Sequence, residues 1–417
     1  MSFDSLMLED LNIQLIDGDR GKNYPKQSEF QEKGHCLFLS AKNVTKTGFQ
    51  FAEKVYISED RHNRLRSGKL ERNDIVLTTR GTIGNVAFYD DSIDDEVVRV
   101  NSGMLILRAD SSIWNPRFLY FLFTSRIVQE QIASLTSGSA VPQLPAKDLK
   151  KFSLPRIPLE AQSYIVKVIG DLSDKLVINT QTNQTLEQMA QAIFKSWFVD
   201  FDPVKAKMKG EQPEGMDDAT ASLFPEKLVE SELGLIPEGW GVGELSKLFE
   251  LHRGFDLPKS KRQDGEYPVY AAGGYHGTHN EFKMEPPGII TGRSGVIGNV
   301  YLSLDKYWPL NTTLYVREFR TCGPYYAYHL LRSLDLKSLN SGSAVPSLNR
   351  NFVHSTNVSH PDSDVLAKFE EIVTPLFEKM VANNEQNKSL SELRDTLLPK
   401  LLSGEIELDI AEVNLND

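Results

Sequence analysis

The hexapeptide SGSAVP occurs at residues 137–142 and again, letter for letter, at 341–346. The match extends into the flanking sequence. SLTSGSAVPQL (134–144) lies over SLNSGSAVPSL (338–348) at an offset of 204, VNSGMLILR (100–108) resembles LNTTLYVRE (310–318), and TTRGTIGNV (78–86) lies over TGRSGVIGNV (291–300) with one residue inserted. Blocks that recur in the same order indicate an internal repeat. Because 417 residues also exceed what one ordinary core organises, we expect two similar domains.

Each half carries short β-rich runs, then SGSAVP, a proline and a long helical stretch. The runs DIVLTTRGTIGNVAFY (74–89) and PGIITGRSGVIGNVYL (287–302) combine β-branched residues with glycine and lack a helical period, which predicts strands and tight turns. Short helices are expected at 115–133 and 324–338. Each half is therefore predicted to be an α+β domain.

A long helix is expected after Pro158 and another after Pro361, since proline is common at helix starts. Seam residues recur in alternating steps of four and three, the pattern of a coiled coil. They are Ile165, Ile169, Leu172, Leu176, Asn179, Asn183, Leu186, Met189, Ile193 and Trp197 in the first helix, and Phe369, Val373, Leu376, Met380, Asn383, Asn387, Leu390, Leu393, Leu397 and Leu401 in the second. Pro375 and Pro399 lie inside the second pattern and should kink or shorten that helix.

Each seam contains two asparagines, Asn179 and Asn183 in the first helix and Asn383 and Asn387 in the second. Paired asparagines on a seam fix its register. An antiparallel pairing sets Asn179 against Asn387 and Asn183 against Asn383, whereas a parallel pairing sets Asn179 against Asn383. The sequence admits both, and the connectivity of two equal units favours the antiparallel form. The alternative is two amphipathic helices that each pack on their own domain.

These features predict a first domain at 1–157, a spacer helix region at 158–208, a linker at 209–232, a second domain at 233–360, a C-terminal spacer helix at 361–408 and a tail at 409–417. A helix of about 40 residues is about 60 Å long. Two similar domains held apart by such a rod would measure the spacing between two sites on a partner. Duplex DNA, read at regularly spaced half-sites, is the obvious candidate.

The net charge of −11 argues against a nucleic-acid partner, because phosphate neutralisation dominates such binding. Residues 33–80 nevertheless carry ten Lys and Arg against five Asp and Glu, which is either a solvated face or a DNA-facing patch. The sequence shows no signal peptide and no membrane span, so we expect a cytoplasmic protein without a membrane partner. The two cysteines, Cys36 and Cys322, have no zinc-site spacing, so no metal is expected.

Three motifs identify a family that the chain resembles. AIFKSWFVDFDPVKAKM (192–208) ends the first helix, LGLIPEGW (233–240) opens the second domain, and LRDTLLPKLLSGEI (393–406) ends the second helix. Together they strongly resemble the specificity subunit of type I restriction–modification enzymes, over nearly the whole chain. The resemblance implies two similar target recognition domains separated by two long helices, which pack as an antiparallel coiled coil with pseudo-twofold symmetry.

In that family each domain reads one half of a bipartite site on double-stranded DNA, and the helices set the gap and dock two modification subunits. The resemblance therefore implies a non-catalytic chain. Methylation with S-adenosylmethionine belongs to the modification subunits, and ATP- and Mg-dependent translocation and cleavage to restriction subunits. No GxxxxGK[ST] phosphate loop occurs in this sequence. NPRF (115–118) approaches an adenine-methyltransferase tetrapeptide, but Arg117 replaces its second proline, so a helix N-terminus is the favoured interpretation.

Residues expected to contact DNA lie on polar, Gly-rich turns, where amides and hydroxyls reach phosphates and arginine reaches guanine. In the first domain they are Lys42, Asn43, Thr78, Thr79, Arg80, Gly81, Ser137, Ser139 and Gln143. In the second they are Tyr270, Gly273, Gly274, Tyr275, His276, Arg293, Ser294, Ser341, Ser343, Ser347, Asn349 and Arg350. Simple β-turns are the alternative for the Gly and Asn positions of GTIGNV and GVIGNV.

SGSAVP itself is a poor candidate for base reading, because domains that read different half-sites should differ where they touch bases. We assign it to phosphate contact or to docking of each domain on its helix. The aromatic and acidic end of the first helix is expected to meet a modification subunit; its residues are Trp197, Phe198, Asp200, Phe201, Asp202 and Pro203. The alternative for this cluster is a cap on the helical seam.

Two other functions are compatible with the sequence. One is a stand-alone DNA adenine methyltransferase or nuclease with its own recognition domains. The other is a coiled-coil scaffold without affinity for DNA.

Overall fold

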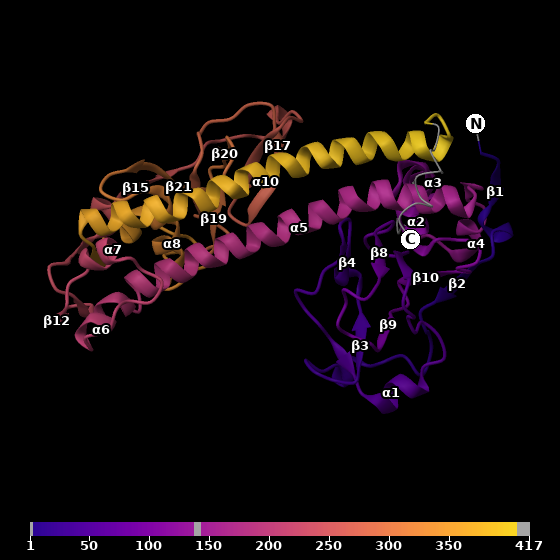
Figure 1. The fold of residues 1–417 in the computed structure, drawn as a ribbon, viewed down its shortest axis with the longest axis horizontal. Coiled ribbons are helices and arrows are strands. Elements are labelled where there is room, and N and C mark those ends of the chain that lie inside the picture. Colours follow the sequence, from indigo (N-terminus) through magenta and orange to yellow (C-terminus); the bar gives the residue numbers. More distant parts are fainter. Residues whose placement is uncertain (1–2, 137–142, 407–417) are drawn as a thin grey trace. The chain divides into compact units, whose positions relative to one another are not determined.

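The computed structural model describes residues 3–136 and 143–406. Ser137 and Ser139, in the first copy of SGSAVP, therefore lie outside the described residues. The chain divides into two compact units, one formed by residues 1–177 with 387–417 and the other by residues 178–386. Each unit combines β-sheets, short helices and parts of two long helices, α5 (Leu159–Phe198) and α10 (Ser363–Ser403), as Figure 1 shows. The predicted α+β class is confirmed.

The elements of the first unit follow the expected order of strands, short helices and a long helix. Its strands are β1 (Ser5–Met7), β2 (Ile13–Asp17), β3 (Cys36–Leu39), β4 (Val44–Thr45), β5 (Gly48–Phe49), β6 (Tyr56–Ile57), β7 (Asp74–Thr78), β8 (Val86–Tyr89), β9 (Val98–Val100), β10 (Met104–Ala109) and β11 (Ser153–Pro155). Its short helices are α1 (Glu59–Arg64), α2 (Pro116–Thr124), α3 (Arg126–Thr136) and α4 (Ala146–Leu149).

The second unit adds two short helices and a hairpin before its own domain begins. Its strands are β12 (Leu228–Ser231), β13 (Gly234–Pro237), β14 (Gly241–Glu244), β15 (Phe249–Arg253), β16 (Tyr267–Ala271), β17 (Gly274–His279), β18 (Gly288–Gly292), β19 (Val300–Ser303), β20 (Trp308–Pro309), β21 (Thr313–Phe319) and β22 (Asn357–His360). Its short helices are α6 (Asp202–Met208), α7 (Asp218–Ser222), α8 (Pro324–Ser333) and α9 (Arg350–His354). The predicted linker at 209–232 thus carries α7 and β12.

The two units repeat the same sheets. A four-stranded antiparallel sheet has the order β2-β10-β7-β8 in the first unit and β15-β21-β18-β19 in the second. A three-stranded sheet has the order β6-β3-β9 and β17-β16-β20, and its last pair is parallel in both units. β1 pairs with β11 as β14 pairs with β22. The internal repeat is therefore a repeat of topology.

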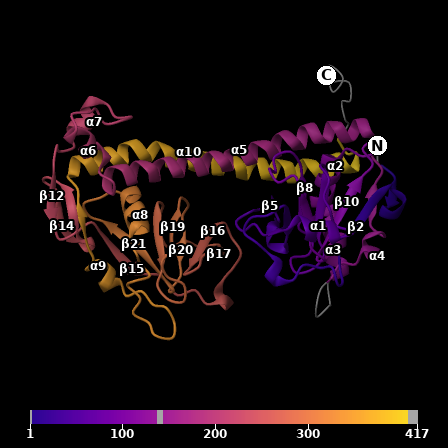
Figure 2. The same cartoon turned by 90° about the horizontal axis from the view of Figure 1, so that it is seen from below.

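The two long helices pack antiparallel within each unit, side by side in both views (Figures 1 and 2). In the first unit, Ile165 and Ile169 of α5 share a core with Leu398 and Leu401 of α10. In the second, the C-terminal part of α5 packs on the N-terminal part of α10 around Phe369. The predicted antiparallel coiled coil is confirmed.

Proline does not end α10, which is continuous from Ser363 to Ser403, so the prediction that Pro375 and Pro399 shorten this helix is wrong. An interior proline removes one backbone hydrogen bond. Close neighbours of each proline, Phe377 and Leu398, are buried. Packing of the apolar seam offsets the lost bonds, as it does for most helices in proteins.

The central asparagines of the seam pair as the antiparallel arrangement requires. Asn383 Nδ2 donates a hydrogen bond to Asn183 Oδ1 at 2.8 Å, and Asn183 Nδ2 donates to Asn384 Oδ1 at 2.8 Å. Asn179, expected opposite Asn387, donates to Gln386 Oε1 at 2.8 Å. The parallel alternative is excluded.

The aromatic end of α5 lies inside the second unit. Trp197 and Phe198 are 6% and 8% exposed and pack around Phe369, with ring centroids 6.1 and 5.2 Å from it. Phe201, at φ 55°, turns the chain into α6, whose Pro203 is also buried. The expectation that Trp197, Phe198 and Pro203 meet another subunit is corrected, because this reversal buries them in their own fold.

Candidate nucleic-acid interface

Two equivalent turns form the centre of the candidate surface: residues 79–85 join β7 to β8, and residues 293–299 join β18 to β19. At the start of each turn, two successive N–H groups donate to the carbonyl of the residue directly before the neighbouring strand. Thr79 and Arg80 donate to Gly103, and Arg293 and Ser294 donate to Thr312, at 2.8 and 3.2 Å in both units. Positive-φ glycines also coincide, Gly81 with Gly295 and Gly84 with Gly298.

These anchors align the two turns without a gap at an offset of 214, so Arg80 corresponds to Ser294 and Arg293 corresponds to Thr79. The inserted residue expected from the sequence is therefore wrong. The alignment of VNSGMLILR with LNTTLYVRE is also shifted by one residue, because Leu105 and Leu314 pair with Leu77 and Thr291, which are equivalent at the offset of 214. Since side chains alternate along a strand, a slip of one residue exchanges its faces.

Only part of the predicted first-domain set reaches the surface. Arg80 and Gly81 are exposed. Thr78 and Thr79 are 0% and 4% exposed, and the Thr78 hydroxyl accepts from the Asn85 N–H at 3.0 Å. The structure thus corrects Thr78 and Thr79 from DNA-contact candidates to buried supports of the turn.

SGSAVP contacts the turn rather than a long helix where the structure describes it, in its second copy. The Gly295 N–H donates to Pro346 O at 2.9 Å, and the Leu348 N–H donates to Arg293 O at 2.8 Å. Ser341 N–H and Oγ donate to Ser347 O at 2.8 and 3.0 Å. Ser343 is exposed. In the first unit, Gln143 forms an isolated antiparallel β-bridge with Arg80, as Ser347 does with Ser294 in the second unit.

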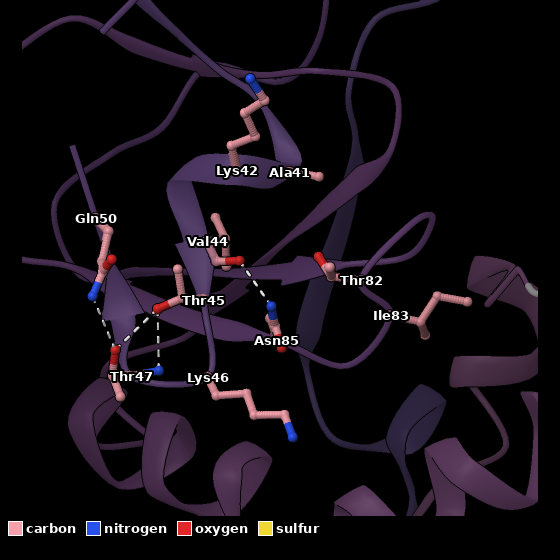
Figure 3. Close-up of a pocket in the computed structure, with 10 residues that line it drawn as sticks. All are labelled: Ala41, Lys42, Val44, Thr45, Lys46, Thr47, Gln50, Thr82, Ile83 and Asn85. Carbon is pink, nitrogen blue, oxygen red and sulfur yellow. Dashed lines mark hydrogen bonds between the residues drawn. The ribbon is translucent and has the colours of Figure 1, made fainter. Parts of the chain in front are cut away.

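Next to the first turn lies an open hollow of about 680 Å³, lined by Ala41, Lys42, Val44, Thr45, Lys46, Thr47, Gln50, Thr82, Ile83 and Asn85. The β4–β5 hairpin forms one side of it, with Thr45, Thr47 and Gln50 linked by hydrogen bonds (Figure 3). The second unit has only Ala272 and Gly273 between the corresponding strands β16 and β17. The hairpin therefore belongs to the first unit alone.

Lys42 and Asn43, which lie directly before this hairpin, differ in accessibility. Lys42 is exposed and pairs with Glu53 at 3.2 Å. Asn43 is 6% exposed, accepts from the Ser40 N–H at 2.9 Å and donates to Glu53 O at 2.9 Å. Asn43 is therefore corrected from a DNA contact to a buried support, because its amide already serves the loop.

The corresponding β16–β17 turn of the second unit presents Tyr275, which is 65% exposed, together with exposed Gly273 and His276. Gly274 is buried at φ +103°, where a Cβ would lie 2.8 Å from the Tyr301 ring. Tyr270 packs edge-on against Tyr307 at 6.1 Å, and burial raises the pKa of its hydroxyl. Gly274 and Tyr270 thus hold the turn that displays Tyr275.

The second unit also has a basic hollow of about 270 Å³, lined by the predicted residues Arg293, Ser341, Ser347, Asn349 and Arg350. A residue missed in the sequence, Arg253 at the end of β15, completes it. No motif marks Arg253, and only the pairing of β15 with β21 brings it here. The one signal in the sequence that could have indicated Arg253 is its position at the end of a strand, directly before a glycine.

Half of the cationic side chains in the basic tract at 33–80 form ion pairs. Five of its ten cationic side chains pair with carboxylates: Lys42 with Glu53, Lys54 with Asp95, Arg61 with Glu29, Arg64 with Asp60 and Arg72 with Asp91. At these five positions the ion pairs favour the interpretation of a solvated face.

NPRF begins a helix, as the favoured interpretation had it. Asn115 caps α2 by accepting from the Arg117 and Phe118 N–H groups at 3.0 and 3.3 Å, and Pro116 is the first helical residue. Arg117 pairs with Asp174 of α5. Among the described residues there is no cluster of His, Cys, Asp and Glu that could hold a metal ion. No helix in the described ranges is long and apolar enough to span a membrane.

Comparison with known proteins identifies the family. Residues 13–188 and 237–391 match the model of the type I restriction modification DNA specificity domain. The HindI specificity subunit of Haemophilus influenzae is 28% identical, over 93% of this chain and 98% of its own, and the MjaIX specificity subunit of Methanocaldococcus jannaschii is 24% identical, over 86% and 84%. The S subunit structure from M. genitalium shares the fold, with TM-score 0.55 at 18% identity over 96% of both chains. The chain belongs to the family of type I restriction–modification DNA specificity domains.

Proposed function

We propose that the chain is the non-catalytic DNA-recognition subunit of a type I restriction–modification complex, in which each unit reads one half of a bipartite site. The observation that carries this proposal is the repeated turn with different side chains. One frame presents Arg80 and Thr82 in the first unit and Ser294 and Val296 in the second. Equal frames with unequal side chains suit two readers of different sequences, because base edges specify and backbone contacts position.

The remaining roles are assigned to the helices and to other chains. α5 and α10 set the gap between half-sites and dock two modification subunits. With the aromatic rings buried, the exposed residues Val199 and Asp202 are the part of the α5 end that is left for such a contact. Methylation with S-adenosylmethionine, and translocation and cleavage with ATP and Mg²⁺, reside in the modification and restriction subunits.

The test maps methylated adenines in cells that express the chain with its modification subunits. We expect a motif of two parts with a fixed gap, which disappears when the gene is deleted. Arg80→Ala should relax or abolish recognition of one part, and Tyr275→Ala the other. Arg126→Ala, a change at an exposed arginine outside the turn, should leave the motif unchanged. A motif in which both variants affect the same part contradicts one reader per unit.

The stand-alone enzyme predicts turnover without partners. The purified chain, incubated with labelled S-adenosylmethionine and DNA, should transfer no label until modification subunits are added. Transfer by the chain alone would overturn the subunit assignment.

A further inference from the structure

The basic hollow of the second unit concentrates positive charge without a carboxylate in its lining. Its residues are Arg253, Arg293, Arg350, Ser341, Ser347, Asn349, Leu314 and Leu348. The arginines come from three separate elements: the end of β15, the turn after β18 and the first residue of α9. Since like charges repel at close range, an assembly of three guanidinium groups calls for an anion.

Neighbouring contacts offset only part of this charge. Arg253 pairs with Asp256 at 3.3 Å, but the two side chains are 52% and 69% exposed, so the pair is weak. The Arg293 Nε donates to Asn311 O at 3.0 Å, which orients the guanidinium without neutralising it. Within the described ranges, no ion pair involves Arg293 or Arg350. The hollow therefore keeps a net positive charge.

The lining also suits a small oxyanion. The Ser347 hydroxyl and the Asn349 amide add neutral donors to the guanidinium groups, whereas the Ser341 hydroxyl already donates to Ser347 O. A volume of about 270 Å³ holds several waters, each of which takes about 30 Å³, but is below the usual size of a pocket for a whole small-molecule ligand. A phosphate group is small enough for a hollow of this volume, and its oxygens can accept from the lining donors.

At the described positions that correspond to the three arginines, the first unit carries no cation. Strand register places Asp17 where the second unit has Arg253, because Leu105 and Leu314 are their respective partners. In the turn alignment, buried Thr79 of the first unit corresponds to Arg293 of the second. Across the SGSAVP region, where the offset is 204, Ala146 corresponds to Arg350. Asp17 pairs with Arg20 at 3.0 Å. Three cations in one unit thus correspond to one anion and two neutral residues in the other.

We propose that Arg253, Arg293 and Arg350 bind a single backbone phosphate of the half-site read by the second unit, and that the first unit lacks this contact. The proposal rests on the proposed function. A guanine edge is the competing occupant, but one arginine satisfies it. A phosphate presents several acceptor oxygens around its negative charge, so three arginines lining one small hollow can bond to it together. The contact anchors the second unit on DNA and carries no sequence information.

The test uses the complete complex with modification subunits and a duplex that contains the mapped site. Arg253→Ala and Arg350→Ala should each weaken binding at least about tenfold and reduce the slope of log K against log salt by about one. The double variant should reduce the slope by no more than that, because the residues share one phosphate. Arg317→Ala, at an exposed arginine of the same unit outside the hollow, is the control. Its slope should match the wild type.

A scan with methylphosphonates, each of which removes one phosphate charge, identifies the occupant. One position in the second half-site should weaken wild-type binding and have no further effect on the double variant. Relaxed specificity at one base pair with an unchanged salt slope would overturn the proposal in favour of a guanine contact. An equal effect of both single variants on the first half-site would also overturn it. If the wild-type complex showed no bipartite site at all, the proposed function itself would fail, which the first measurement reveals.

Discussion

Asn383 donates to Asn183 at 2.8 Å across the seam between α5 and α10 in the second unit, so a buried asparagine on α10 is paired with a half-buried one on α5. The two side chains depend on each other. Asn383 is 3% exposed, and without Asn183 its amide would lose this bond in a buried site. An unsatisfied buried group costs about 1–3 kcal/mol, whereas replacing both partners by apolar groups can be nearly neutral.

We therefore expect Asn183→Leu alone to lower the free energy of unfolding by about 1–3 kcal/mol. The double variant Asn183→Leu/Asn383→Leu should recover most of this loss. Denaturant titration followed by circular dichroism measures both values. Lys379→Ala, on the exposed side of α10, serves as the matched control. A double variant less stable than the single one would contradict the pairing.

The repeat, the α+β class and the antiparallel seam follow from the sequence because each rests on many residues. Register does not. Thr78 and Thr291 look equivalent in sequence, and the hydroxyl of each donates to a backbone carbonyl of the following turn. Strand pairing nevertheless shows that the equivalent of Thr291 in the first unit is Leu77, not Thr78. One residue of slip is invisible to a comparison of similar letters and is fixed by hydrogen bonds between strands.

Burial explains the other differences. Asn43 and Trp197 carry side chains typical of binding surfaces, yet both are buried. The segments that cover them could not be identified from the sequence. Asn43 is held by Ser40 and Glu53, and Trp197 packs on Phe224 at 5.0 Å. Arg253 is the reverse case, because its role emerges only when β15 pairs with β21.

At Gly254 the backbone passes so close to a neighbouring segment that one added methyl group should lower the stability of the second unit. A Cβ there would lie 2.2 Å from Leu310 O, a backbone atom that cannot move aside cheaply. We expect Gly254→Ala to destabilise the second unit by about 1–3 kcal/mol, as overpacking does. Gly273→Ala is the control, since no atom lies within 4 Å of its added Cβ. Thermal unfolding should separate the two, and equal melting temperatures would contradict the close approach.

The spacer role of the helices predicts a change in the gap. Seven residues inserted after Val177 in α5 and seven after Gln386 in α10, where the chain passes between units, lengthen each helix by about 10 Å and preserve the seam to within about 20°. At about 3.4 Å per base pair, the methylated motif should gain about three base pairs between unchanged half-sites. Methylome sequencing measures this. Altered half-sites with an unaltered gap would contradict the spacer role.

Glu370 of α10 makes the stability of the second unit depend on pH. Its carboxylate accepts from the Tyr326 N–H at 2.7 Å and the Tyr325 N–H at 3.4 Å at the start of α8, and burial raises its pKa from 4.5 to about 7. The folded state thus binds this proton more tightly than the unfolded state. Stability from Glu370 is full below pH 4.5 and is lost as the pH rises towards 7.

Glu370→Gln keeps one acceptor oxygen and removes the titration. The unfolding free energy of the variant relative to the wild type should therefore rise between pH 5 and 8, by about 1.4 kcal/mol for each unit of pKa shift before solvent screening reduces it. His329, whose pKa burial lowers to about 4, changes stability in the opposite direction but does so in both proteins, so it cancels in the difference. Denaturant titrations at pH 5, 6, 7 and 8 measure the slope. A difference that stays constant over this range would show that Glu370 is ionised throughout in the folded chain.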